Sequence, residues 1–373
     1  MVRKYRLGFI LTVQLGNSTR FEILKKFAQR DPEVDFFWAP IDYRSSSATP
    51  FIRFIRHISE GLYWRLLVLR ETWPVLKNFR TMDAIMVHQF EPSLVLSIAR
   101  YFGRKPAIVS STDDTPLINI KDHPMYANEL RRSSFTQKLR LRIDLWRARR
   151  ADISIPMSKW AADILVKHCG VNPETVHPLH VGLDFERWPK VTRVRAERST
   201  TKKLLFVGSD FERKGGEMLL KVHQQHFAER AELHLVAKGI THRNFPNVFW
   251  YSDLSSHDEQ LRDLYGQSDI FVLPTHSDVS SWVALEAHAS SLPVIITDVG
   301  GISEIVVDGE TGILLKRGDE AGLVSAIERL LNDPQKCKEF GEAGRSLVER
   351  SFNAETNVRR ILSLMKGIGR RTN

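Results

Sequence analysis

Short apolar segments alternate with helix-forming segments along this chain, and this alternation constrains its fold more than any other feature. The apolar segments are rich in β-branched and aromatic residues and have the length of buried strands. Strands that alternate with helices form a parallel sheet with helices on both faces. Predicted strands of the first half lie at 5–15, 34–41, 83–90 and 106–112, and a second series follows at 204–210, 233–239, 247–253, 269–275 and 293–298. We therefore expect an α/β protein with two Rossmann-like, doubly wound domains.

A polar stretch separates the two series of strands. Residues 185–203 are charged and polar, and they lack apolar periodicity. We place the boundary there, which predicts an N-terminal domain of residues 1–190, a C-terminal domain of residues 191–350 and a terminal helical segment at 351–373. Ligands of such sheets bind beyond the carboxyl ends of the strands. The polar residues that follow each predicted strand are therefore the candidates for a functional site.

Composition sets the class and the expected compartment. The chain of 373 residues is 42% hydrophobic, which is sufficient for two buried cores. Its two cysteines, Cys169 and Cys337, show neither metal-ligand spacing nor a disulfide framework. No uncharged apolar run approaches the roughly 18 residues of a membrane span, and the apolar segment near the start is read as a strand rather than as a signal peptide. We expect a cytoplasmic protein.

The stretch from Leu273 to Val306 predicts an anion site between a strand and a helix. The backbone N–H groups at the start of a helix, together with the positive end of its dipole, suit a diphosphate. Glu286, about one turn into the helix, is placed to accept hydrogen bonds from the two hydroxyls of a ribose, and Asp278 in the loop is placed to face a sugar. The predicted cradle for phosphate or sugar consists of Ser280, Ser281, Trp282 and Val283.

A second strand-to-helix junction carries two cations. Arg213 and Lys214 stand between the predicted strand 204–210, which includes Gly208, and a helix from Met218 onward. Arginine offers a planar fork of donors and lysine a compact charge, so the pair suits a leaving diphosphate. The alternative is a solvated turn whose glycines only begin a helix, and an isolated pair would favour it. The position of this pair ahead of Asp278 and Glu286 in the chain favours a diphosphate site.

Asp278 and Glu286, followed by LPVIITDVGGISEIV, resemble the donor signature of the retaining glycosyltransferases of family 4, which have the GT-B fold. Two glutamates separated by seven residues are usual in that family; here Asp278 replaces the first, and residues 279–282 replace its Gly-Phe-Gly-Leu loop. Further motifs at 204–216, 247–274 and 308–315 follow in the order of the family.

The resemblance implies transfer of a hexose, with retention, from a nucleoside-diphosphate sugar to an acceptor hydroxyl. Two domains would face each other across a cleft, the terminal helix would return to the first domain, and the acceptor proton would pass to the donor phosphate. Arg213 and Lys214 would stabilise the leaving group, Glu286 would hold ribose, and Asp278 would contact the sugar. Gly300, Gly301 and Glu304 would shape the rear of the pocket, and Gly16 and Gly208 would also belong to the donor site. No Asp-x-Asp motif ends a strand, so we expect no metal or other cofactor.

The acceptor side would lie in the first half, where the candidates are weaker. Gly16 follows the first strand and would approach the sugar or diphosphate, although a lone glycine turn is most often only a turn. Asp113 and Asp114 follow another strand, and capping of backbone N–H groups in an Asx-turn explains them equally well. His88 follows a third strand, and a buried, hydrogen-bonded histidine is the common case.

The excess of positive over negative charge lies in the first half. Residues 1–190 hold 30 Lys and Arg against 19 Asp and Glu, whereas the remainder holds 24 against 25. Two basic stretches, 51–70 and 130–150, combine apolar and Arg residues. An anionic membrane surface is one partner for them, and two domain helices with core-facing stripes are the alternative. No nucleic-acid-binding module is visible, so nucleic acid is not an expected partner.

The sequence therefore predicts a glycosyltransferase with a nucleotide-sugar donor and a glycan or lipid-linked acceptor. Two other classes stay open. A non-catalytic nucleotide-sugar-binding protein or complex subunit would not hydrolyse the donor, even slowly. A sugar-nucleotide epimerase of related fold would interconvert the free nucleotide sugar without a transfer product.

Overall fold

The computed structural model describes residues 3–13, 16–42, 60–88, 106–112, 135–189, 201–239, 242–252, 254–255 and 257–371. The chain divides into two compact units. Unit 1 comprises Met1–Val181 and Ala354–Asn373, and unit 2 comprises Gly182–Asn353. The division precedes the polar stretch in the sequence, and Leu183 and Trp188 are buried in the core of unit 2.

Unit 1 contains a five-stranded parallel sheet with the strand order β2-β1-β3-β4-β5. Four of its strands lie where the apolar segments predict them, and β5 was not among the predicted strands. The strands are β1 Tyr5–Thr12, β2 Val34–Ile41, β3 Ala84–His88, β4 Ala107–Thr112 and β5 Ile153–Pro156. The described helices are α1 Gly16–Ala28, α3 Glu60–Leu76, α7 Phe135–Ala148, α8 Lys159–Lys167 and α14 Ala354–Arg371, with short 3-10 turns at Phe79–Thr81 and Pro173–Thr175.

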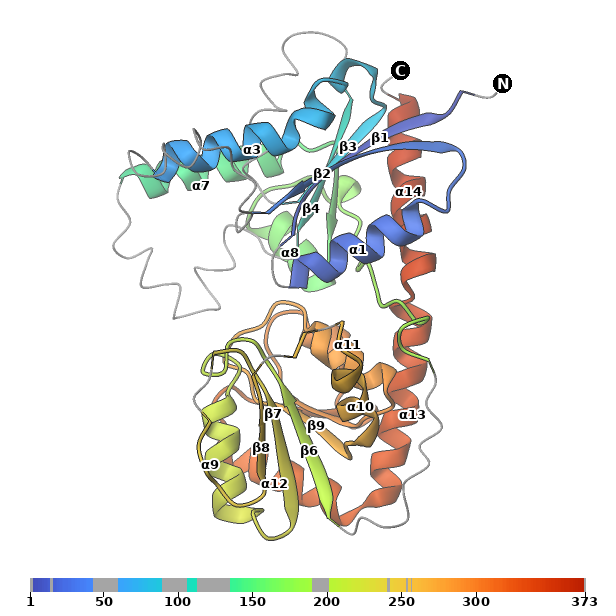
Figure 1. Cartoon of the computed structure of the whole chain (residues 1–373). Helices are drawn as coiled ribbons and strands as arrows, with labels where there is room; N and C mark the ends of the chain where they lie inside the picture. Colours follow the sequence, from blue (N-terminus) through green and yellow to red (C-terminus); the bar gives the residue numbers. More distant parts are fainter. Residues whose placement is uncertain are drawn as a thin grey trace. The chain divides into compact units, whose positions relative to one another are not determined.

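The terminal helix α14 packs in unit 1, against α1 and strands β3 and β4 (Figure 1). Its apolar residues recur at helical spacing, and the resulting stripe is buried: Val358, Ile361, Leu362 and Met365. Lys366 near its end donates to Asp31 and Glu33 at 2.7 and 2.8 Å. Helix α3 packs against β1 and β2. The segment of the chain from Ala354 onward is therefore part of the core of unit 1.

Unit 2 contains a six-stranded parallel sheet with the order β11-β10-β9-β6-β7-β8. Its strands are β6 Lys202–Val207, β7 Ala231–Val236, β8 Val248–Tyr251, β9 Ile270–Leu273, β10 Val294–Thr297 and β11 Gly312–Leu315. Its helices are α9 Gly216–His226, α10 Glu259–Gln267, α11 Trp282–Ala289, α12 Glu320–Asn332 and α13 Pro334–Ser351, with a 3-10 turn at Ile302–Glu304. The predicted α/β class with two Rossmann-like sheets is confirmed.

The strand order of unit 2 reverses between the neighbouring strands β6 and β9. Strand β6 leads through α9 to β7 on one side, whereas β9 leads through α11 to β10 on the other. Helix α9 packs with α12, helix α11 packs with α13, and α9 and α11 lie on opposite faces of the sheet (Figure 1). The loops that follow β6 and β9 therefore diverge from adjacent strand ends. Ligands of open α/β sheets bind at such a switch point.

Across the described ranges, no helix is long and apolar enough to cross a membrane.

Candidate functional site

Two loops meet at the switch point of unit 2, and glycines allow the contact. Gly215 ends the loop after β6 with a φ of +80°, and a Cβ there would lie 2.0 Å from the carbonyl oxygen of Pro274 in the loop after β9. A side chain at this position would therefore be strained and would clash with backbone. At Gly208 a Cβ would approach the Lys214 side chain to 3.1 Å. The glycines let the β6 loop fold tightly against the β9 loop.

Arg213 joins the two loops through its guanidinium group and its backbone. Its Nη1 donates to the carbonyl oxygen of Ser277 at 2.7 Å, and its Nε donates to Oδ2 of Asp210 at 2.9 Å. The carbonyl of Arg213 accepts from the N–H of His276 at 2.9 Å. The terminal nitrogen Nη2 has no hydrogen bond to any residue that the structure describes. The guanidinium is thus held by two of its nitrogens and keeps donors for a ligand.

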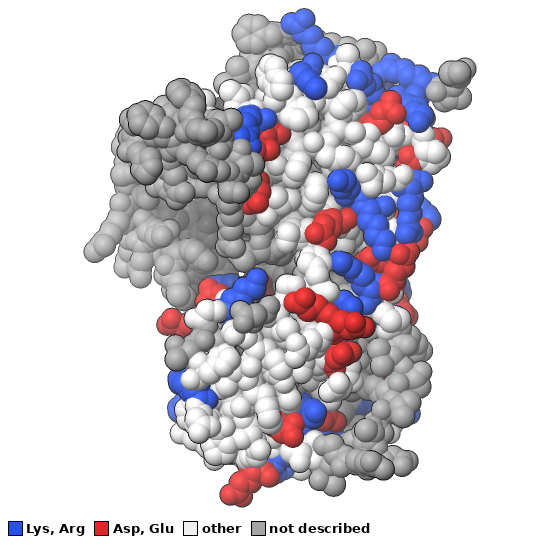
Figure 2. Space-filling model, viewed as in Figure 1, with Lys and Arg blue, Asp and Glu red and all other residues white. Residues whose placement is uncertain are grey.

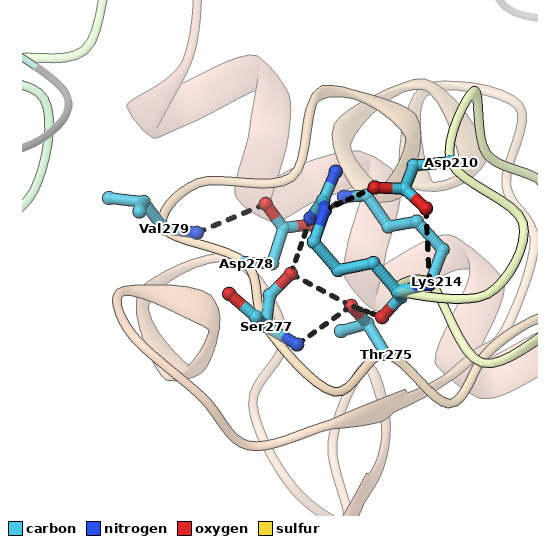
Figure 3. Close-up of polar contacts among 7 residues, drawn as sticks. Asp210, Lys214, Thr275, Ser277, Asp278 and Val279 are labelled. Carbon is cyan, nitrogen blue, oxygen red and sulfur yellow. Dashed lines mark hydrogen bonds and ion pairs between the residues drawn. The ribbon is translucent and has the colours of Figure 1, made fainter. Parts of the chain in front are cut away.

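Lys214 forms an ion pair with Asp278, across the same two loops (Figure 3). The two side chains are only 12% and 10% exposed. The second carboxylate oxygen of Asp278 accepts from the backbone N–H of Val279 at 3.0 Å. Because both oxygens are used, the carboxylate is fixed, and it in turn fixes the position of the lysine ammonium.

Thr275 sets the shape of the β9 loop (Figure 3). Its buried hydroxyl lies 3.0 Å from the carbonyl oxygen of Ser277 and accepts from the Ser277 N–H at 3.3 Å. A hydroxyl that bonds backbone groups two residues ahead closes a local turn. This turn presents the Ser277 carbonyl to Arg213.

Helix α11 begins directly after this loop. Ser281 is its N-cap, with extended backbone angles, and its buried hydroxyl makes no capping hydrogen bond. The N–H groups of the first turn of a helix have no partner within the helix, and they carry its positive dipole end. The predicted cradle of Ser280, Ser281, Trp282 and Val283 thus coincides with the start of α11.

Glu286 lies on α11 and is buried, in contrast to Asp278. Its Oε2 accepts from the hydroxyl of Tyr265, on α10, at 3.0 Å. Burial raises the pKa of the Glu286 carboxyl to about 7, and the hydrogen bond from Tyr265 opposes the shift because it stabilises the ionised form. Near neutral pH this carboxyl is therefore poised between its two protonation states.

Gly300 and Gly301 hold the loop that carries Asp278. Gly300 has a φ of +62°, and a Cβ there would lie 2.3 Å from the Asp278 carbonyl oxygen. The N–H of Gly301 donates to the Val279 carbonyl at 2.9 Å, and Glu304 ends the 3-10 turn that follows. The structure therefore brings Gly208, Arg213, Lys214, Asp278, Gly300 and Gly301 together at one strand edge, with the start of α11 beside them.

Of the candidate residues in unit 1, the structure describes Gly16 and His88. Gly16, predicted to follow the first strand and to approach the sugar or diphosphate, is the first residue of α1. His88 ends β3 and is buried, and its Nδ1 lies 2.8 Å from Nη1 of Arg20 and 2.9 Å from the carbonyl oxygen of Ser111. Asp113 and Asp114 lie outside the described residues. Of the acceptor-side candidates, only His88 has a described hydrogen-bond network.

Sequence reasoning missed several partners of these residues. Asp210 stands three residues before Arg213 in a turn, and that spacing could have indicated it. Ser277 accepts from Arg213 through its backbone carbonyl, and a contact of this kind does not depend on the type of side chain. Tyr265 and Arg20 contact Glu286 and His88 from elements distant in sequence. Within the part of the chain that the structure describes, no group of three or more His, Cys, Asp or Glu residues could hold a metal ion.

Two family models match adjacent parts of the chain. The model of the group 1 glycosyl transferases matches residues 189–347, and the model of glycosyltransferase family 4 matches residues 19–187. The chain belongs to the group 1 glycosyltransferases of the family 4 type, and its fold is the GT-B fold of that class.

Curated relatives match parts of their own length. The chain is 36% identical over 110 residues to the capsular polysaccharide biosynthesis glycosyltransferase CapM of Staphylococcus aureus. This alignment covers 30% of this chain and 28% of that protein. It is 27% identical over 226 residues to glycogen synthase of Mycobacterium tuberculosis, covering 57% of this chain and 54% of that protein. The alignments thus span from about a quarter to about half of these relatives.

Solved structures resemble the whole chain. Sucrose-phosphate synthase from Thermosynechococcus elongatus superposes with a TM-score of 0.75 at 18% identity, covering 98% of this chain and 99% of that one. HepE from Anabaena in complex with UDP superposes with a TM-score of 0.72 at 16% identity, covering 97% and 100%. At these identities the likeness establishes the fold.

Proposed function

We propose that this chain transfers a hexose from a nucleoside-diphosphate sugar to an acceptor hydroxyl, with retention of anomeric configuration. The observation that carries the proposal is the pair Arg213 and Lys214, anchored at the unit 2 switch point beside the start of α11. Membership of the group 1 glycosyltransferases supports the reaction class. The neighbour HepE was solved with UDP and with UDP-glucose, which supports a nucleotide-sugar donor.

The two cations suit the diphosphate of the donor. Arg213 is held through Nε and Nη1, so its guanidinium needs little reordering to direct Nη2 at a phosphate oxygen. Lys214 adds a compact charge that is only partly exposed. Pre-oriented donors stabilise charge that develops on a leaving group, and such an interaction accelerates the chemical step.

The two acids have different environments and therefore different proposed roles. Asp278 lies at the loop beside the cations, where it would contact hydroxyls of the donor sugar while it orients Lys214. Glu286 lies further along α11, where its carboxylate would accept hydrogen bonds from the ribose of any nucleotide. Gly300 and Gly301 would keep the Asp278 loop in place, and Glu304 would close the rear of the pocket.

The acceptor, we propose, is a glycan or a lipid-linked molecule at an anionic membrane surface. On α3, Val68 and Val75 are buried in the core, whereas Trp73, two residues from Val75, is 59% exposed. On α7, Trp146 is exposed and lies 5.3 Å below the guanidinium of Arg150. Exposed aromatic and basic side chains together favour a membrane interface. The part of unit 1 that Figure 2 shows in colour carries basic and acidic side chains interleaved. The surface that we propose for lipid is the one with Trp73 on α3 and Trp146 on α7.

The test is a nucleotide screen followed by a transfer assay. UDP, GDP, ADP and their sugars are added at increasing concentration, and a ligand at 100 times its dissociation constant stabilises the fold by about 2.7 kcal/mol. The donor selected is then supplied with membrane extracts or glycans, and NMR of the product gives the anomeric configuration. Donor binding without hydrolysis or transfer would indicate a binding protein, and interconversion of the free donor would indicate an epimerase.

A further inference from the structure

Tyr265 is a buried hydroxyl-bearing residue that the proposed function has not yet used. Its ring, on α10, is fully buried, stacked on Phe271 of β9 at 5.9 Å and edge-on to Trp188 at 5.3 Å. Its hydroxyl lies 3.0 Å from Oε2 of Glu286 and 3.3 Å from the carbonyl oxygen of Val283. Three elements of the unit 2 core therefore fix where this hydroxyl points.

The hydroxyl has a single proton and two acceptors within reach. An ionised carboxylate is a stronger acceptor than a carbonyl, so an ionised Glu286 takes the proton of Tyr265. A protonated Glu286 can instead donate to the Tyr265 oxygen, which frees the hydroxyl to donate to Val283. The direction of this hydrogen bond thus follows the protonation of Glu286.

We propose that Tyr265 is a positioning residue for the nucleotide site: it holds Glu286 through Oε2, so that Oε1 accepts the hydroxyls of the donor ribose. The inference rests on the proposed function of Glu286 and deepens it. The hydrogen bond selects the ionised, accepting form of the carboxyl, and the locked ring prevents the carboxylate from turning away.

The surrounding charges leave Tyr265 as the main polar influence on Glu286. On α13, Arg345 donates to Glu349 at 2.6 Å and to the carbonyls of Trp188 and Ala289. On α11 itself, burial lowers the pKa of His288 to about 4, so that this imidazole is neutral at pH 7. Among the described residues, Tyr265 is the group whose side chain bonds the Glu286 carboxyl.

The pH dependence follows from these contacts. Burial raises the pKa of Glu286 to about 7, and the ionised form is the one that accepts from ribose. Nucleotide affinity should therefore be highest above pH 7 and should fall as the pH drops through 7. Loss of the Tyr265 hydroxyl removes a bond that stabilises the ionised form, so the pKa of Glu286 should rise further and the midpoint should move to higher pH.

The experiment is calorimetric titration of UDP, GDP and ADP between pH 6 and pH 9 into the full chain and into Y265F, E286Q and Y251F. Tyr251 is a matched control, because its hydroxyl bonds His234 at 3.0 Å elsewhere in unit 2. We expect Y265F to lose about tenfold or more of the affinity at pH 7, as for a hydrogen bond to a charged group, and less at pH 9. Y251F should follow the wild-type profile.

The E286Q variant separates Glu286 from the titration of the phosphate. E286Q keeps any pH dependence of affinity that comes from titration of the nucleotide. The pH dependence that is present in the wild type and absent in E286Q is therefore due to Glu286. A Y265F midpoint equal to that of the wild type, or a uniform loss at every pH, would overturn the positioning role and leave Tyr265 as a core residue. If Y265F does not fold, an E286Q profile identical to the wild-type profile overturns it. A wild type that binds no nucleotide at any pH would instead overturn the proposed function.

Discussion

The basic side chains at the carboxyl edges of the two sheets differ in their burial and in their hydrogen-bond partners. At the switch point of unit 2, Arg213 and Lys214 are partly exposed, and both bond carboxylates. In unit 1 the strand order also reverses, between β1 and β3, and there Arg20 is buried and its guanidinium bonds Nδ1 of His88 and the hydroxyl of Ser111. One type of fold thus presents its cations at one edge and encloses a cation at the other. The proposed ligand site of unit 2 therefore differs from the network of unit 1, which joins α1 to strands β3 and β4.

The largest effect is expected from Arg213 and Lys214. R213A or K214A should lower turnover about a hundredfold or more, because each removes charge stabilisation that is greatest in the transition state. The matched controls are R230A and K221A, whose cations pair with Glu328 and Glu320 on the surface of the same unit. Steady-state kinetics with the correct donor and acceptor decide the matter. Wild-type turnover in both R213A and K214A would remove the pair from the mechanism.

Substitutions of Glu286 and Asp278 should differ in which ligand they affect. E286A should weaken both the nucleoside diphosphate and the nucleotide sugar about ten- to a hundredfold, as expected for a lost charged hydrogen bond. D278A should weaken the free nucleotide less than E286A does, through the loss of its ion pair with Lys214. It should lower transfer about ten- to a hundredfold, since its proposed contact is with the donor sugar. Calorimetry with each ligand distinguishes them. Equal losses of nucleotide affinity in the two variants would show that the acids are placed wrongly along the donor.

The enclosed arginine should act on stability. R20A removes the partner of His88 and Ser111 inside unit 1 and should cost about 2 kcal/mol, or about thirtyfold in the folding equilibrium. Chemical denaturation of R20A beside R213A measures the contrast. R213A should lose less stability, because its side chain is partly exposed and the Ser277 carbonyl keeps its contact with the Thr275 hydroxyl. If R20A were as stable as R213A, the comparison between the two edges would fail.

The smallest effect concerns the surface of unit 1. The protein should sediment with anionic vesicles at low salt and be released as salt rises, because attraction between exposed charges is screened over about 10 Å at 0.1 M. W73A and W146A should weaken sedimentation, whereas F249A, which removes an exposed ring of unit 2, should not. Absence of vesicle binding at low ionic strength would favour a soluble acceptor.

The sequence predicts those parts of the molecule that depend on local pattern. Apolar runs mark nine of the eleven described strands, and β5 and β11 were not among the predicted ones. Arg213, Lys214, Asp278 and Glu286 could be named as candidates because side chains of suitable chemistry follow strand ends in the order of the family. Gly300 could be named from the sequence because it is a glycine. The need for a glycine there, which is the close approach of the Asp278 carbonyl, is visible only in the structure.

The remaining features depend on contacts between distant segments. The bond from Tyr265 to Glu286 requires the packing of α10 against α11, and no periodicity reports it. The burial that raises the pKa of Glu286 has the same origin. The pairing of Lys214 with Asp278 joins loops 64 residues apart, although each loop was recognised separately. A prediction of ligand-facing residues could therefore name the groups but could not assign their hydrogen bonds.

The most direct test is a crystal structure of the full chain with the nucleoside diphosphate that the screen selects. We predict phosphate oxygens within hydrogen-bond distance of Arg213, Lys214 and the first N–H groups of α11, and ribose hydroxyls on the Glu286 carboxylate while its Oε2 stays with Tyr265. A nucleotide bound in unit 1, or one whose phosphates lie away from the β6 and β9 loops, would contradict the account.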